Sequence, residues 1–147
     1  MQSGERVAKA CRVWRGVSRG AKGVSRGVGD RPMDKPMVQE TEWGRMTWLA
    51  GRSVGNAQTI TLGRVIIKRG CCNPRHGHRE GEEVLHLLRG QLRHSLGGDV
   101  VTMGPGDTIV IPAGVFHNAE SVGDEDAEMI VAYPTGERDF VKEGDER

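Results

Sequence analysis

The chain of 147 residues has few aromatic residues, few cysteines and almost no net charge. Phe, Trp and Tyr make up 4% of it, and its formal net charge is +1. A near-neutral chain is poorly suited to binding polyanions over its whole surface, so no nucleic-acid partner is expected. No apolar run approaches the ~20 residues that span a bilayer, and no apolar core of a secretory signal is present, so no membrane partner is expected.

The three cysteines do not form a disulfide framework. Cys71 and Cys72 are adjacent, so a bridge between them would be strained, and Cys11 lies in a segment of low complexity. Stable disulfides belong to oxidising compartments, and their absence predicts a cytoplasmic protein.

The charge is unevenly distributed along the chain. Residues 1–31 hold eight Lys or Arg against two acidic residues, whereas the remainder holds 13 against 18. Residues 1–36 are also rich in glycine and repeat GVSRG at 16–20 and 23–27. This composition predicts a disordered basic tail, or a start codon assigned too far upstream. An organelle transit peptide and a nucleic-acid-binding tail are the functional alternatives.

One domain accounts for the rest of the chain. A sequence of this length can bury a single core, and we expect one domain over residues 37–137. Residues 138–147 have no periodicity and end in KEGDER, which predicts a disordered, solvated tail.

The sequence pattern of the body of the chain predicts a series of short strands. Turn signals such as Gly-Gly at 97–98 and Gly-Pro-Gly at 104–106 separate runs that alternate or are rich in β-branched residues. About eight strands and no convincing helix predict an all-β fold, a small antiparallel β-barrel or jelly roll. The predicted strands are 46–50, 58–70, 83–90, 91–98, 99–103, 107–114, 115–121 and 127–133.

The first of two chemically informative motifs pairs two histidines with a glutamate. It runs Gly70, five residues, His76, one residue, His78, four residues, Glu83, six residues, Gly90. In an extended segment, the two histidines lie on the same face of one strand, close enough to share an ion. The polar, glycine-broken stretch between them and the glutamate predicts a turn onto a neighbouring strand.

The second motif supplies a third imidazole. It runs Gly106, five residues, Pro112, one residue, Gly114, two residues, His117. Either motif alone could arise by chance in a chain with 28% charged residues, but the two in order indicate a metal site. Three imidazoles and one carboxylate favour Fe(II), Mn(II) or Co(II), with Zn and Ni as further candidates. Four protein ligands would leave two positions of an octahedron open.

Together the motifs resemble those of the cupins, over about residues 43–135. The resemblance implies a cupin fold, or double-stranded β-helix. It also implies that one divalent transition metal, with Mn or Fe expected first, is bound by His76, His78, Glu83 and His117. Ser121 stands where the family pattern often has Asn, a residue that is not a ligand.

The remaining histidines are expected to pack rather than react. His86 has the opposite strand parity to Glu83, which predicts a packing or surface role. His94 alternates with leucines and is expected on a buried face, either hydrogen-bonded in the core or lining the pocket, with a core role favoured. Leu85, Leu87 and Val115 are predicted to face inward and make the pocket mostly apolar.

The function predicted from these residues is that of a metal-dependent enzyme acting on a small molecule. An oxygenase-type oxidoreductase is the first hypothesis, with isomerase, lyase or decarboxylase chemistry also known among cupins. A non-catalytic module that anchors a small molecule is the alternative. No catalytic residue is predicted besides the metal centre itself. No anion clamp or cofactor fingerprint appears, because Arg75 and Arg79 have the wrong parity to point inward. A homodimer would cover exposed sheet edges.

Overall fold

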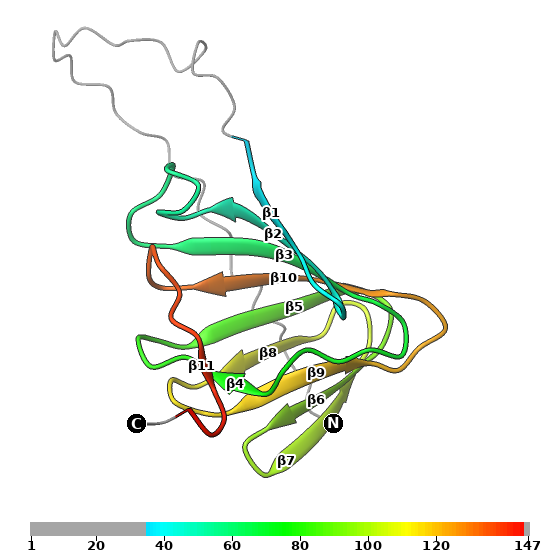
Figure 1. Cartoon of the computed structure of the whole chain (residues 1–147). Coiled ribbons are helices and arrows are strands. Elements are labelled where there is room, and N and C mark those ends of the chain that lie inside the picture. The colour runs from blue at the N-terminus through cyan, green and yellow to red at the C-terminus, as the bar shows by residue number, and fades with distance from the viewer. Residues whose placement is uncertain (1–34, 146–147) are drawn as a thin grey trace, which may run out of the picture. The chain divides into compact units, whose positions relative to one another are not determined.

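Residues 35–145, which the computed structural model describes, form eleven strands and no helix. The predicted all-β jelly roll is confirmed (Figure 1). No described segment forms a helix of the length and apolarity needed to cross a membrane. The strands are β1 (Met37–Glu40), β2 (Gly44–Ala50), β3 (Thr61–Ile67), β4 (His76–Gly77), β5 (Glu83–Arg89), β6 (Leu92–Leu96), β7 (Asp99–Met103), β8 (Thr108–Ile111), β9 (His117–Ser121), β10 (Ala127–Tyr133) and β11 (Val141–Lys142).

The strands form two antiparallel sheets. One has six strands in the order β1-β2-β3-β10-β5-β8, and the other has five in the order β11-β4-β9-β6-β7 (Figure 1). All eight predicted strands are present as β2, β3 and β5 to β10. The sequence did not predict β1, β4 and β11. β1 is exposed throughout and shows no alternation, and the other two contain only two residues each.

Strand β10 shows how the sequence selects the buried face. Its alternate residues Ala127, Met129, Val131 and Tyr133 are buried, and the residues between them are only half-buried. Because successive side chains of a strand point to opposite faces, this pattern directs four side chains between the sheets. β10 pairs with β3 on one side and β5 on the other, so it lies at the centre of the six-stranded sheet.

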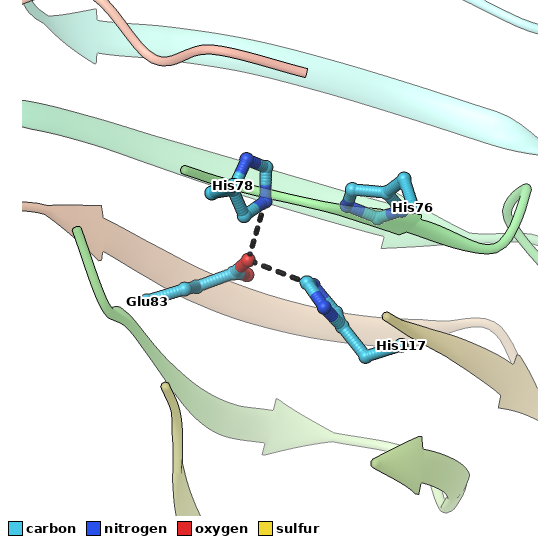
Figure 2. A group of neighbouring side chains, drawn as sticks. All are labelled: His76, His78, Glu83 and His117. Atoms are coloured by element: carbon cyan, nitrogen blue, oxygen red, sulfur yellow. Dashed lines mark hydrogen bonds and ion pairs between the residues drawn. The ribbon is translucent and has the colours of Figure 1, made fainter. Parts of the chain in front are cut away.

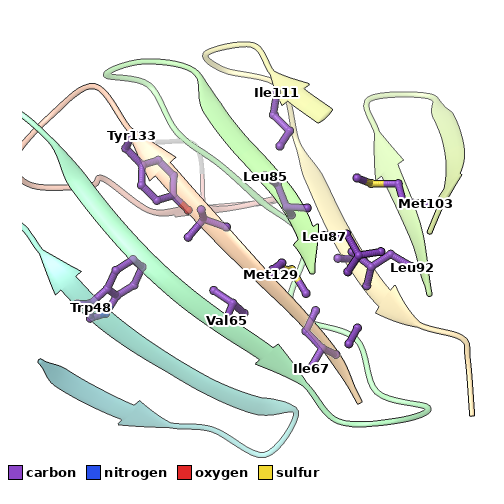
Figure 3. Close-up of a cluster of buried hydrophobic side chains, with 13 residues drawn as sticks. Trp48, Val65, Ile67, Leu85, Leu87, Leu92, Met103, Ile111, Met129 and Tyr133 are labelled. Carbon is purple, nitrogen blue, oxygen red and sulfur yellow. The ribbon is translucent and has the colours of Figure 1, made fainter. Parts of the chain in front are cut away.

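A cluster of buried apolar side chains packs in the space between the sheets (Figure 3). Burial of each large apolar side chain stabilises the fold by roughly 1.5–3 kcal/mol. The cluster consists of Trp48, Val65, Ile67, Leu85, Leu87, Leu92, Met103, Ile111, Ala119, Ala127, Met129, Val131 and Tyr133.

The indole of Trp48 packs closely over Gly63. A Cβ atom added to Gly63 would lie 2.7 Å from Cζ3 of Trp48, which is closer than real Cβ contacts allow. The two residues are cross-strand partners between β2 and β3. Glycine is therefore needed at this point of β3 to accommodate the ring.

The last described residues differ from the prediction. A solvated tail was predicted for residues 138–147, but β11 pairs with β4 through Val141 opposite Gly77 and Lys142 opposite His76. A strand of two residues is too short for alternation to appear in the sequence, and its partner determines its conformation. The tail predicted for residues 1–36 lies outside the described residues up to residue 34, as do residues 146 and 147.

Candidate metal centre

The four residues of the two motifs converge at one point between the sheets (Figure 2). His76 belongs to β4 and is the cross-strand partner of His117, the first residue of β9. His78 follows β4, and Glu83 is the first residue of β5. All four are buried, and one potential ligand atom from each lies within 4.8 Å of those of the others. The cluster could hold a metal ion.

A backbone carbonyl holds each of the three imidazoles in place. A carbonyl oxygen only accepts hydrogen bonds, so each Nδ1 must donate its proton, and a neutral ring then carries its lone pair on Nε2. The three rings are thus fixed in the tautomer that can bind a metal through Nε2. The distances from Nδ1 to the carbonyl oxygen are 2.7 Å for His76 and Pro74, 2.5 Å for His78 and Asp139, and 2.9 Å for His117 and Val115.

The Glu83 carboxylate faces two of these Nε2 atoms. Its Oε2 lies 3.0 Å from Nε2 of His78 and 3.1 Å from Nε2 of His117 (Figure 2). The Nε2 atom of His78 is buried and has no hydrogen-bond partner among the described residues, in spite of the short distance to the carboxylate. Lone pairs on these nitrogens would repel the carboxylate unless a proton, as in the hydrogen bond between His117 Nε2 and Glu83, or a metal cation lies between them. The donor set therefore fits a metal ion.

Burial keeps the donors in the forms that bind metals. Burial, together with the nearby His117, lowers the pKa of His76 to about 4, so this imidazole is neutral at neutral pH. Burial alone would raise the pKa of Glu83, but interactions with His117 and His78 outweigh it and lower that pKa below its usual range. Glu83 is therefore an ionised carboxylate, the form that binds a metal.

A cavity of about 470 Å³ opens beside the four residues. Glu83, His76 and His117 line it. Of the three apolar residues predicted for its wall, Leu85 lies there, whereas Leu87 and Val115 do not line it. The pocket was predicted to be mostly apolar, and many of its lining residues are apolar. The apolar lining includes Trp43, Met46, Val65, Ile67, Met129 and Val131.

His94 lies in the wall of this cavity and not only in the core. Its ring stacks on that of His117, with 5.8 Å between centroids and 14° between planes. Its buried Nδ1 has no hydrogen-bond partner among the described residues. Burial, with His117 as the next cause, lowers the pKa of His94 to about 4. His86 lies on the other face of β5, where Nδ1 is 2.8 Å from the Thr108 hydroxyl.

Sequence reasoning missed three further residues around the centre. Phe140 stacks on His76, with 4.5 Å between ring centroids, and Tyr133 meets His78 edge-on at 5.0 Å. Arg138 lines the cavity as well. Tyr133 could have been found from its alternation with Val131, but the segment after it has no periodic pattern.

The hydroxyl of Tyr133 interacts with both Glu83 and Arg138. Burial and the charge of Glu83 raise the pKa of Tyr133 well above its usual value. The phenol is therefore a protonated donor at neutral pH. Arg75 and Arg79 do not line the cavity, in agreement with their strand parity.

An antiparallel jelly roll with three histidines and one glutamate at its centre defines a class of small β-barrels with a candidate metal site. The sequence model described as "Cupin domain" matches residues 63–133. This match, the curated relatives and the fold together indicate the cupin superfamily, which confirms the resemblance seen in the two motifs.

Named relatives and solved structures agree with this family. Germin-like protein 3-8 of Oryza sativa subsp. japonica is 33% identical over 86 residues, covering 53% of this chain and 37% of that protein. Germin-like protein 3-3 of the same organism is 31% identical over 93 residues, covering 58% and 41%. The match thus spans less than half the length of these relatives.

The structural similarities concern the fold. An oxalate decarboxylase of Lactobacillus farciminis in complex with formate superimposes with a TM-score of 0.67 at 22% identity, covering 73% of this chain and 33% of that one. An oxalate oxidase structure gives a TM-score of 0.63 at 23% identity, covering 70% and 56%.

Proposed function

We propose that this chain is a metal-dependent cupin enzyme acting on a small oxygen-bearing molecule. One Fe(II) or Mn(II) ion would be held by His76, His78, Glu83 and His117. The observation that carries the proposal is the orientation of the imidazoles: each Nδ1 is tied to a carbonyl, so that the Nε2 atoms are free to share an ion with the carboxylate. Co, Zn and Ni are further candidates for the same donors.

Different residues have different roles at this centre. When bound, such an ion supplies Lewis acidity and, as Fe or Mn, reactivity toward O₂. The backbone carbonyls orient the imidazoles, and Glu83 contributes the negative charge that adjusts the acidity of the site. The apolar walls of the cavity exclude water from a bound substrate, and the Tyr133 hydroxyl stands beside Glu83 in the same wall.

Two reaction types are the first to test. Oxygenase chemistry follows from the expected metals, and decarboxylation is the reaction named for one of the structural neighbours. The names of those neighbours, an oxalate decarboxylase and an oxalate oxidase, also support the choice of carboxylates for a first substrate screen.

Elemental analysis of protein reconstituted with Mn, Fe, Co, Ni and Zn in turn tests the metal site. We expect one ion per chain with ligand distances of ~2.0–2.2 Å. His117→Ala should lose the ion, and Glu83→Gln should hold it more weakly, whereas the matched control His86→Ala should retain it. Protein that takes up none of these metals would refute the proposal.

Turnover separates an enzyme from a binding module. The metal-loaded protein is offered carboxylates, including oxo-acids, and then diols and flavonols, while O₂ uptake and CO₂ release are recorded, with His117→Ala as the inactive control. Turnover that His117→Ala abolishes is the expected result. Suppose instead that wild type turns over none of them, and that both proteins bind one small ligand equally well. The enzyme proposal would then fail, and a non-catalytic binding module would be the better description of the chain.

The proposal includes a homodimer. Val110, Val84, Ala132 and Leu62 are successive cross-strand neighbours on the outer face of the six-stranded sheet, and Val110 is 50% exposed. Such an apolar row on an exposed face favours association with another copy. Light scattering after size-exclusion chromatography should give twice the mass of the chain, and a monomer mass would exclude the dimer.

A further inference from the structure

The cavity beside the metal centre is larger than a small dicarboxylate needs. Its volume of about 470 Å³ lies within the range of roughly 300–1,000 Å³ typical of small-molecule sites. Trp43, Met46, Ile67 and Met129 lie in its walls. A ligand that fills this space must present an apolar body to these side chains, because polar groups against such walls would lose their hydrogen bonds to water.

Arg138 is a cation held in place over aromatic rings at the same cavity. Its guanidinium carbon lies 4.7 Å from the ring centroid of Trp48, 5.3 Å from that of Phe140 and 5.6 Å from that of Tyr133. The contact between Gly63 and the Trp48 indole fixes one of these rings in turn. The guanidinium is therefore oriented before any ligand arrives.

No described carboxylate forms an ion pair with Arg138. All Arg–carboxylate pairs in residues 35–145 involve Arg45, Arg64, Arg75, Arg89 or Arg93. Arg138 is half-buried and lines the cavity, and a half-buried guanidinium without a carboxylate partner is a preformed anion site. Its planar fork matches a carboxylate with two parallel hydrogen bonds.

The charges around the cavity also favour an anion. Lys142 is the second cation in its lining and likewise forms no ion pair with a described carboxylate. Glu83 is the only carboxylate among the described lining residues, and it belongs to the proposed ligand set. A divalent ion there would more than offset its charge.

We propose that the site takes a monocarboxylate with an apolar body of about the size of an aryl group, and that Arg138 is the residue that binds its carboxylate. The inference names the substrate class of the proposed enzyme and so rests on the proposed function. It differs from oxalate, which has no apolar body and would leave most of the cavity unfilled.

Isothermal titration calorimetry of the full-length, Mn(II)-loaded protein tests both parts of the inference. The probes are phenylacetate, acetate and phenylacetamide. Phenylacetate should bind about tenfold or more tightly than acetate, because burial of the ring contributes about as much as burial of a Phe side chain. It should also bind about tenfold or more tightly than phenylacetamide, since the neutral amide forgoes the charge-assisted hydrogen bonds.

Variants of Arg138 test whether this residue causes the preference for phenylacetate over phenylacetamide. Arg138→Gln should bind phenylacetate about tenfold more weakly and no longer distinguish it from the amide. Arg138→Lys, which keeps the charge, should retain part of the preference and shows that a loss in Arg138→Gln is not a loss of folding. Arg93→Gln is the matched control, because Arg93 is exposed and paired with its cross-strand neighbour Glu120 on the outer face of the five-stranded sheet. It should bind like wild type.

Three results would overturn the inference: equal affinities for phenylacetate and phenylacetamide, equal affinities for phenylacetate and acetate, or an unchanged phenylacetate affinity in Arg138→Gln. Titration of the metal-free protein separates this failure from that of the proposed function. If the chain binds no metal but keeps an Arg138-dependent preference for phenylacetate, the enzyme proposal fails and the carboxylate site stands. If the metal binds and substrates turn over without that preference, the enzyme proposal stands and the carboxylate site at Arg138 fails.

Discussion

The two sheets contribute opposite kinds of side chain to the space between them. Ten of the thirteen core residues belong to the six-stranded sheet, whereas only Leu92, Met103 and Ala119 come from the five-stranded one. The five-stranded sheet instead turns His76, His94 and His117 inward. One sheet thus supplies most of the apolar burial and the other supplies most of the imidazoles, so stability and chemistry should respond to different substitutions.

The largest effect is expected from the apolar sheet. Leu87 on β5 is 0% exposed, so Leu87→Ala should lower the free energy of unfolding by about 2–5 kcal/mol through lost burial and a residual cavity. Urea unfolding measures the loss. The neighbouring Leu88 is 44% exposed, and Leu88→Ala should change stability by at most about 0.5 kcal/mol. Equal losses in the two variants would contradict the assignment of the core to this face.

A substitution in the imidazole sheet should instead remove stabilisation that depends on metal. An ion that binds only the folded chain adds about 2.7 kcal/mol when its free concentration is a hundred times its Kd. His76→Ala should lose most of this gain, because one of the four proposed ligands is missing. Unfolding curves with and without Mn(II) provide the measurement. A full metal-dependent gain in the variant would show that His76 is not a ligand.

These expectations rest on a site that was mostly predictable from the sequence. The spacing of two between His76 and His78 places both on one face of an extended segment, and the structure shows both buried at the centre. The turn before Glu83 and the second motif ending at His117 could likewise be predicted from the sequence. Their meeting was inferred from strand topology and the family resemblance.

What escaped prediction lies in segments whose conformation depends on tertiary partners. Asp139 and Arg138 follow the last long strand in a stretch without periodicity. No local pattern therefore marks the Asp139 carbonyl as the hydrogen-bond acceptor for His78, or Arg138 as part of the cavity wall. Strand parity placed His94 on a buried face. Parity alone could not decide whether that side chain packs in the apolar core or lines the cavity beside it.

A substitution of His94 gives a smaller effect that tests the difference between the two sheets. Because its buried Nδ1 has no partner among the described residues, His94→Leu removes an unsatisfied polar atom and should change stability by no more than about 1 kcal/mol. Urea unfolding of metal-free protein checks this. A loss as large as that of Leu87→Ala would mean that the inner face of the five-stranded sheet also supports the fold through its polar side chains.

The smallest effect is expected on the outer face of the apolar sheet. The hydrogen bond from Arg64, 2.7 Å from Glu128, holds the pKa of that carboxyl below its ordinary value of 4.5. A depressed pKa in the folded state adds stability that is present above 4.5 and lost as pH falls through the folded pKa. Glu128→Gln should therefore be slightly less stable than wild type at neutral pH and equal to it in acid. A difference that persists in acid would point to another cause.

The carbonyl of Asp139, which holds the ring of His78, bears on when the centre can form during synthesis. All four proposed ligands have been translated once His117 is made, but the group that orients His78 lies 61 residues after it. β11, which continues the sheet beyond β4, comes later still. A nascent chain that has released both motifs from the ribosome therefore still lacks a fixed third imidazole. We therefore expect the proposed metal to be loaded late, after the chain has been completed through Asp139.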